Sequence, residues 1–225
     1  MIEVAKSAGF CFGVSRALGF VNEGIAEGKK IATIGQIIHN ERVVSELSEK
    51  GVRIIDDPSE AKEGETVVIR SHGVSKKTAE AIKTDFIDAT CPFVKKIQRI
   101  VEKYHEKCYT IIIVGDKTHP EVIGINGWCD NSAVIVGDME EAEQKLLSVA
   151  DLPLCVVAQT TSSVIFWEKL KKFLKKTCQR AEFFDTICSA TDLRQKEALK
   201  IAERSDIFFV IGGKHSSNNK KLVET

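Results

Sequence analysis

The sequence predicts an α/β protein with three similar α/β units in a pseudo-threefold arrangement around a common centre, the third unit being incomplete. Short apolar runs of strand length alternate with amphipathic stretches of helix length along the 225 residues. Cys11, Cys91 and Cys188 each stand just before a predicted helix, and a glycine follows each cysteine by 24 residues. The residue 28 positions after each cysteine is polar: His39, His119 and Ser216. Two spacings kept across three units indicate an internal repeat.

The repeat divides the chain into a first unit at residues 1–87, a second at 88–184 and the N-terminal half of a third at 185–225. Apolar runs bounded by turn residues predict strands at 2–5, 31–34, 52–55, 66–69, 109–114, 133–136, 154–157 and 207–211. Apolar residues at helical spacing predict helices at 14–26, 41–49, 76–82, 91–106, 164–175 and 190–202. In parallel α/β units, functional groups gather past the carboxyl ends of the strands. The three cysteines and the loop residues are therefore expected to converge.

Composition excludes several classes of protein. Lys plus Arg and Asp plus Glu balance at 32 each, which offers no basic surface for nucleic acid. The apolar runs are too short to cross a membrane, and the N-terminus lacks the pattern of a signal peptide. Seven cysteines, an odd number without close pairs, argue against a secreted disulfide framework and favour the reducing cytoplasm.

The three repeated cysteines suggest a metal centre. A helix N-terminus is expected to lower the pKa of a thiol, and the thiolate is the form that binds metal. Three thiolates leave one metal position open to substrate, which fits either a tri-thiolate zinc or a four-iron cluster. The other cysteines are off the repeat register and are interpreted as core or surface residues: Cys108, Cys129, Cys155 and Cys178.

A polar collar around the cysteines suits a phosphate or diphosphate, in a chain without a Gly-rich P-loop motif. Its members are His39, Asn40, His72, His119, Thr160, Thr161, Ser216, Ser217 and Asn218. Of these, Asn40 and Thr161 are interpreted as ordinary loop residues. His72 and Thr160 are taken as corresponding residues at the ends of the second strands. Glu121 is the one carboxylate in the collar and the natural proton donor.

Several motifs together resemble the 4-hydroxy-3-methylbut-2-enyl diphosphate reductase family of the non-mevalonate isoprenoid pathway. They are GFCFGV at 9–14, HN at 39–40, HGV at 72–74, DATCP at 88–92, HPEVIG at 119–124, QTT at 159–161, TICSAT at 186–191 and SSN at 216–218. The resemblance implies three α/β domains around a central [4Fe–4S] cluster. It implies an oxidoreductase that removes the allylic hydroxyl of its diphosphate substrate with two electrons and two protons. The products would be isopentenyl and dimethylallyl diphosphates, and the donor reduced ferredoxin or flavodoxin.

The resemblance also implies roles for individual residues. Cys11, Cys91 and Cys188 would hold the cluster, with one iron left open. Glu121 would supply protons and Thr160 would relay them near the substrate hydroxyl. The diphosphate would be bound by His39, His72, His119, Ser216, Ser217 and Asn218.

The predicted third unit lacks one motif of the family. Only 37 residues follow Cys188, so a Gly-Ala-Ser-Thr-Pro motif that the family carries in the third unit is absent.

The alternative function is a non-catalytic iron–sulfur redox sensor that uses the same three thiolates. A zinc-thiolate alkyltransferase is a third hypothesis, although no signature in the sequence matches one.

Overall fold

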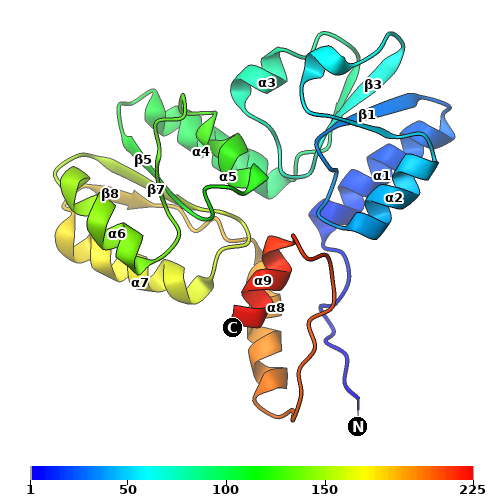
Figure 1. The fold of residues 1–225 in the computed structure, drawn as a ribbon. Coiled ribbons are helices and arrows are strands. Elements are labelled where there is room, and N and C mark those ends of the chain that lie inside the picture. Colours follow the sequence, from blue (N-terminus) through cyan, green and yellow to red (C-terminus); the bar gives the residue numbers. More distant parts are fainter. Residues whose placement is uncertain (1, 225) are drawn as a thin grey trace.

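The computed structural model describes residues 2–224, which form two sheet-containing lobes and a smaller helical part around a common centre (Figure 1). Each lobe contains a four-stranded parallel sheet with helices on its faces. This agrees with the predicted α/β class, and the helical part takes the place of the predicted third unit.

The first sheet has the order β2-β1-β3-β4, and every neighbouring pair is parallel. Its strands are β1 (Lys30–Ile34), β2 (Arg53–Ile55), β3 (Glu65–Ile69) and β4 (Phe86–Asp88). The helices of this lobe are α1 (Phe12–Ala26), α2 (Glu41–Glu49), the 3₁₀ helix η1 (Pro58–Glu60) and α3 (Lys76–Glu80).

The second sheet repeats this order as β6-β5-β7-β8, again all parallel. Its strands are β5 (Thr110–Val114), β6 (Val134–Val136), β7 (Leu154–Ala158) and β8 (Ala181–Phe183). The helices are α4 (Pro92–His105), α5 (Pro120–Asn126), α6 (Met139–Leu146), the 3₁₀ helix η2 (Leu147–Val149) and α7 (Val164–Thr177).

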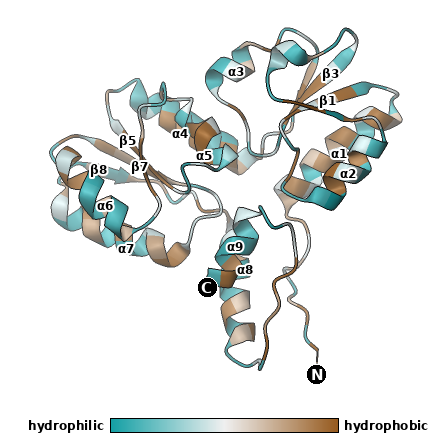
Figure 2. Ribbon diagram, viewed as in Figure 1, coloured by the Kyte–Doolittle hydropathy of each residue, from teal (hydrophilic) through white to brown (hydrophobic). Residues whose placement is uncertain are grey.

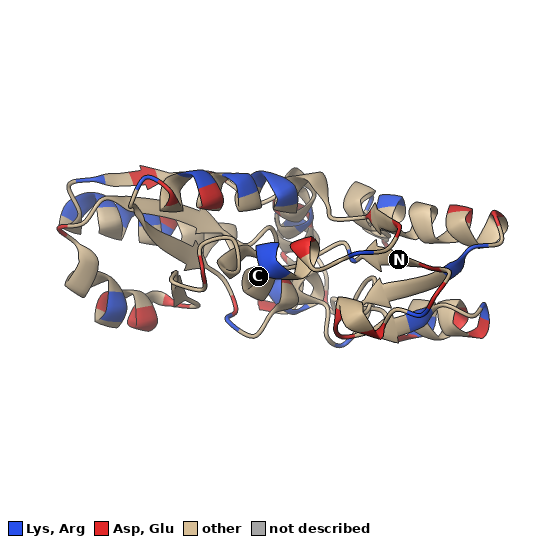
Figure 3. Cartoon of the chain, turned by 90° about the horizontal axis from the view of Figure 1, so that it is seen from above, with Lys and Arg blue, Asp and Glu red and all other residues tan. Residues whose placement is uncertain are grey.

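Both faces of each sheet are buried, which explains why the strands read as continuous apolar runs. On β5, Ile111 and Ile113 pack with Ile97 of α4, whereas Ile112 and Val114 belong to the cluster on the opposite face. The strands are accordingly among the most apolar parts of the ribbon (Figure 2). Charged residues of both signs lie along the outer helices (Figure 3).

The strand order places a switch point in each sheet. The chain leaves β1 toward β2 on one side and returns to β3 on the other, and it does the same from β5. Loops that leave two neighbouring strands in opposite directions open a crevice at their carboxyl ends, which is where such sheets bind ligands. The loops after β1, β3, β5 and β7 all contribute to the site described below.

The third part consists of α8 (Ser189–Ala202) and α9 (Ser217–Glu224). The predicted strand at 207–211 is not formed, and Phe209 is 76% exposed. No strand among residues 2–224 lies beside it, and a lone strand leaves its backbone hydrogen bonds unmade.

The predicted strand at 2–5 is also absent, and no strand within residues 2–224 lies beside it. The residues that follow it are bound to α8. Ser7 N–H donates to the Glu197 carboxylate at 2.9 Å, and the Arg194 guanidinium donates to the carbonyl of Gly9 at 2.6 Å. These contacts connect the start of the chain to the third part.

The other predicted strands and helices are present, with ends shifted by a few residues. Three helices were not predicted, namely α5, α6 and α9, and each has only seven or eight residues. Segments this short show barely two turns of apolar periodicity. No helix among residues 2–224 is both long and apolar enough to cross a membrane.

Candidate functional site

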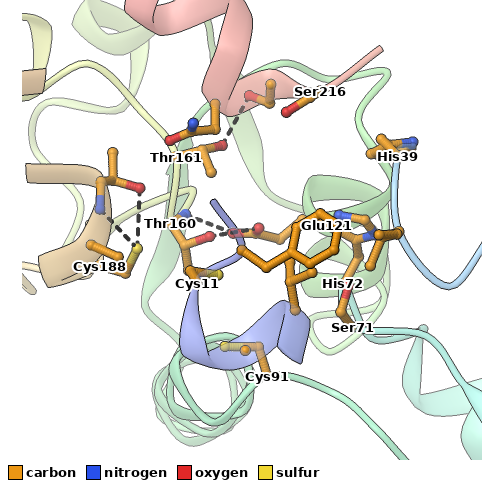
Figure 4. Close-up of a pocket in the computed structure, with 18 of the residues that line it drawn as sticks. Cys11, His39, Ser71, His72, Cys91, Glu121, Thr160, Thr161, Cys188 and Ser216 are labelled. Carbon is orange, nitrogen blue, oxygen red and sulfur yellow. Dashed lines mark hydrogen bonds between the residues drawn. The ribbon is translucent and has the colours of Figure 1, made fainter. Parts of the chain in front are cut away.

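The residues predicted to be functional line one cavity of about 690 Å³ between the three parts of the chain (Figure 4). Cysteines lie on one side of it, histidines on another, and the start of α9 closes a third. All eleven line the cavity: Cys11, His39, His72, Cys91, His119, Glu121, Thr160, Cys188, Ser216, Ser217 and Asn218.

The cysteines occupy matching positions at the N-caps of α1, α4 and α8. Cys91 N–H donates to the carbonyl of Ser71 at 2.9 Å, and Cys188 N–H donates to the carbonyl of Thr160 at 3.0 Å. This pairing makes Ser71 the counterpart of Thr160, so the predicted correspondence of His72 with Thr160 is wrong by one residue.

Gly13 allows α1 and α4 to begin close together. A Cβ atom added at Gly13 would lie 2.6 Å from the Cys91 sulfur and 4.0 Å from the Cys11 sulfur. Any larger residue would therefore displace the Cys91 thiol.

Burial raises the pKa of the Cys91 thiol, although the N–H groups of Phe93 and Val94 lower it. The helix terminus therefore lowers the pKa of this thiol as expected, but burial raises it by more. Desolvation disfavours the thiolate more than the first turn of α4 stabilises it. A bound metal would remove the proton, because metal ligation requires the thiolate.

The three histidine rings pack against one another, with His39 and His72 tilted by 32° and His119 in a T-shaped contact with both. The ring centroids lie 4.6 Å apart for His39 and His72, 5.4 Å for His39 and His119, and 5.3 Å for His72 and His119. Burial lowers the pKa of all three, that of His119 to about 4, and the neighbouring positive charges add to this effect. The cluster is therefore neutral near pH 7.

The histidine cluster could in principle hold a metal ion, since three ring nitrogens lie within 4.8 Å of one another. The hydrogen bonding of His119 favours an anion. Its Nδ1 accepts from the Glu121 N–H at 3.1 Å, so the ring proton is on Nε2 and that atom is a donor. Within residues 2–224, His39 Nε2 and His72 Nδ1 are buried without partners. These atoms can bind a ligand that the cavity holds.

Glu121 and Thr160 form a closed pair in the middle of the cavity (Figure 4). The Thr160 N–H and hydroxyl donate to the two carboxylate oxygens of Glu121 at 2.6 and 2.7 Å. Glu121 is only 2% exposed, and burial raises its pKa to about 7 against the opposing effect of both hydrogen bonds. A carboxyl group with a pKa near 7 can donate a proton at neutral pH.

The third part reaches the cavity through the start of α9. The Thr161 hydroxyl donates to the Ser217 hydroxyl at 2.9 Å, and the Gln159 amide donates to it at 3.4 Å. The loop after β7 therefore fixes α9 over the cavity, beside Ser216.

Asn40 and Thr161, interpreted from the sequence as ordinary loop residues, also line the cavity. Asn40 caps α2 by accepting the Val43 N–H at 3.3 Å, and Thr161 contacts Ser217 as described. Each directly follows a predicted site residue, so its position at the same strand end is the sequence feature that could have identified it as part of the site.

Known proteins support this assignment. The family model described as LytB protein matches residues 2–225. Among curated relatives, the 4-hydroxy-3-methylbut-2-enyl diphosphate reductase of Caldanaerobacter subterraneus is 48% identical over 98% of this chain and 78% of its own length. The enzyme of the same name from a Thermoanaerobacter strain is 49% identical, again over 98% of this chain and 78% of its own length.

Two solved structures share the fold. One is (E)-4-hydroxy-3-methyl-but-2-enyl diphosphate reductase, the terminal enzyme of the non-mevalonate pathway. It is 37% identical, with a TM-score of 0.75, and the match covers 98% of this chain and 80% of that one. The other is the E-1-hydroxy-2-methyl-but-2-enyl-4-diphosphate reductase of Plasmodium falciparum. It is 34% identical, with a TM-score of 0.90, and the match covers 96% of this chain and 70% of that one. The chain belongs to the LytB protein family.

Proposed function

We propose that this chain is a 4-hydroxy-3-methylbut-2-enyl diphosphate reductase, which replaces the allylic hydroxyl of its substrate by hydrogen and releases water. The observation that carries the proposal is the single cavity that joins three thiols, a buried carboxyl group and a cluster of anion-binding groups. The name shared by the curated relatives and the solved structures supports it.

The three thiols suit a [4Fe–4S] cluster. Cys11, Cys91 and Cys188 are free cysteines that line one side of the cavity, each at the N-terminus of a helix, where the dipole stabilises negative charge. Three cysteine ligands leave one iron without a protein ligand. When bound, the cluster supplies the electrons and a Lewis acid beside the allylic hydroxyl.

The opposite side of the cavity suits the diphosphate. His119 presents a ring N–H, and His39 and His72 have buried ring nitrogens that lack partners within residues 2–224. Hydroxyl and amide groups from Ser216, Ser217 and Asn218 line the adjoining side of the cavity, at the start of α9. Hydrogen bonds from these groups to the phosphate oxygens would orient the substrate with its hydroxyl toward the thiols.

Glu121 and Thr160 perform the proton transfer in this proposal. Glu121 is protonated over a substantial fraction of molecules at pH 7, because burial raises its pKa to about 7. The carboxyl group gives a proton to the departing hydroxyl through the Thr160 hydroxyl, 2.7 Å away. Two electrons and two protons turn the C–OH into C–H and water. The allylic double bond can accept the new hydrogen at either end, which accounts for two products.

Further expectations belong to the same proposal. The units would run from 1–87, 88–184 and 185–225, and reduced ferredoxin or flavodoxin would deliver the electrons. None of the seven cysteines is in a disulfide, which suits a reducing compartment such as the cytoplasm.

Anaerobic reconstitution tests the proposal. The protein should take up about four irons per chain, as expected for one four-iron cluster. With a chemical reductant it should convert the hydroxylated allylic diphosphate to isopentenyl and dimethylallyl diphosphates. A cluster-containing protein that leaves this substrate unchanged would instead support a redox sensor, and a colourless protein with one zinc would exclude both.

A further inference from the structure

Arg70 is a largely enclosed charge beside the histidine cluster, immediately after β3 and two residues before His72. Within the described residues, its Nε is buried and has no hydrogen-bond partner. The side chain does not line the cavity. A guanidinium in this position needs a reason, because burial of a charge is costly unless something compensates it.

Gly35 gives this guanidinium its place. A Cβ atom added at Gly35 would lie 2.2 Å from Nη1 of Arg70 and 3.0 Å from Cζ, and Gly35 has a φ of +67°. The guanidinium therefore packs on the bare backbone that follows β1. The loop after β1 also carries His39, so one turn holds both the histidine and the charge beside it.

The second unit holds a neutral residue in the same position. Gly115 follows β5 as Gly35 follows β1, and a Cβ atom added there would lie 2.8 Å from the Gln159 amide oxygen. Gln159 follows β7 as Arg70 follows β3. The repeat thus offers a natural comparison, in which the same packing position carries an amide instead of a guanidinium.

The charge of Arg70 acts on all three imidazoles. It contributes to the lowered pKa of His39, His72 and His119, after the larger effect of burial. Lys220 and His215 act in the same direction on His39, and Asp116 opposes them at His119. A field that disfavours a proton on the cluster favours an anion there by the same Coulomb interaction.

The cavity itself supplies little free positive charge. Arg194 is the one Lys or Arg side chain in its lining among the described residues. Its guanidinium donates to the carbonyls of Ser7 and Gly9. The neutral histidines can donate hydrogen bonds but provide no net charge for a diphosphate.

We propose that Arg70, held on Gly35, is a positioning residue that supplies the fixed positive charge by which the histidine cluster attracts the substrate's diphosphate. This inference rests on the proposed function. It assigns the hydrogen bonds to the imidazoles and the long-range attraction to a residue that does not touch the ligand.

Calorimetric titration of the anaerobically reconstituted protein with inorganic pyrophosphate tests this assignment. Arg70→Gln, which copies the second unit, should weaken binding about tenfold, or about 1.4 kcal/mol. Arg70→Lys keeps the charge and should stay within about threefold of the wild type. Arg99→Gln is the matched control, since Arg99 is exposed on α4 and its loss changes the net charge equally.

Two further measurements separate charge from structure. A field effect predicts that Arg70→Gln raises the KM for the substrate with little change in kcat. It also predicts that protonation of the histidines, seen as stronger pyrophosphate binding in acid, begins at higher pH than in the wild type. Unchanged pyrophosphate affinity and an unchanged pH profile in a folded Arg70→Gln protein would overturn the inference.

Asp56→Asn is the second variant, for the case that Arg70→Gln does not fold. Asp56 is exposed, and its carboxylate raises the pKa of Arg70 by a direct charge interaction. Its removal should strengthen pyrophosphate binding about twofold, and no effect relative to Asp151→Asn would count against Arg70. A wild-type protein that does not bind pyrophosphate at all would instead refute the proposed function.

Discussion

Replacing Glu121 by Gln tests the proposed proton donor with the smallest change of shape. The carboxylate accepts two hydrogen bonds from Thr160, at 2.6 Å from the N–H and 2.7 Å from the hydroxyl. A glutamine keeps one oxygen to accept the N–H and presents an NH₂ group to the hydroxyl, which can accept from it. The fold should therefore lose only about 1 kcal/mol of stability, the usual net worth of one hydrogen bond.

Turnover should fall much further. An amide cannot give up a proton near pH 7, and a positioned acid contributes about 10²–10⁴-fold to a rate. We expect kcat to fall within this range, with iron content, cluster colour and pyrophosphate affinity unchanged. Anaerobic turnover with a chemical reductant, iron analysis and calorimetry measure these quantities on the same sample.

Glu140→Gln is the matched control, because Glu140 lies on the exposed side of α6 outside the cavity. This variant should behave as the wild type in all three measurements. If Glu121→Gln kept more than a tenth of wild-type turnover, the carboxyl group would not be the acid. If the variant lost its iron instead, Glu121 would act by supporting the thiols.

The other predictions concern neighbouring residues. Because the acid form of Glu121 persists only up to a pKa of about 7, turnover should decline as the pH rises above that value. Thr160→Val removes both the relay hydroxyl and a hydrogen bond that lowers this pKa. Turnover should fall, the decline of the remaining turnover should begin at higher pH, and Thr160→Ser should restore both. Cys188→Ala should sharply reduce iron per chain, whereas Cys108→Ala, at an exposed cysteine, should not. Ser217→Ala removes the acceptor of the Thr161 hydroxyl and should weaken pyrophosphate binding about fivefold in calorimetry.

Much of the site could be predicted because the repeat keeps constant spacings of 24 and 28 residues after each of the three cysteines. Cys91 and Cys188 follow the last strands of the two sheets, and His39 and His119 follow the first. Parallel strands present their carboxyl ends at one edge, so equal spacing along the chain means equal placement in space. The seven-residue helix α5 was missed for the opposite reason, since its apolar pattern is too short to be distinctive.

Contacts between residues far apart in the sequence decided two features that the local patterns did not predict. Residues 2–5 alternate like a strand, but no strand within residues 2–224 lies beside them, and it is the residues that follow, Lys6 and Ser7, that Glu197 and Arg194 bind. The correspondence of Thr160 with Ser71 could not be read either, because Arg70-Ser71-His72 and Gln159-Thr160-Thr161 contain different residues. The ends of β3 and β7, and the hydrogen bonds from the Cys91 and Cys188 N–H groups to Ser71 and Thr160, show the register.

The sequence by itself determined the α/β class, the repeat and eleven of the residues that line the cavity, because local periodicity and constant spacing carry that information. Only the tertiary structure decided the chemical state of those residues. Burial turns Glu121 into an acid with a pKa of about 7, keeps the histidines neutral and raises the pKa of the Cys91 thiol. Those effects depend on the number of atoms that exclude water around each group, and that number arises only when segments distant in the chain pack together.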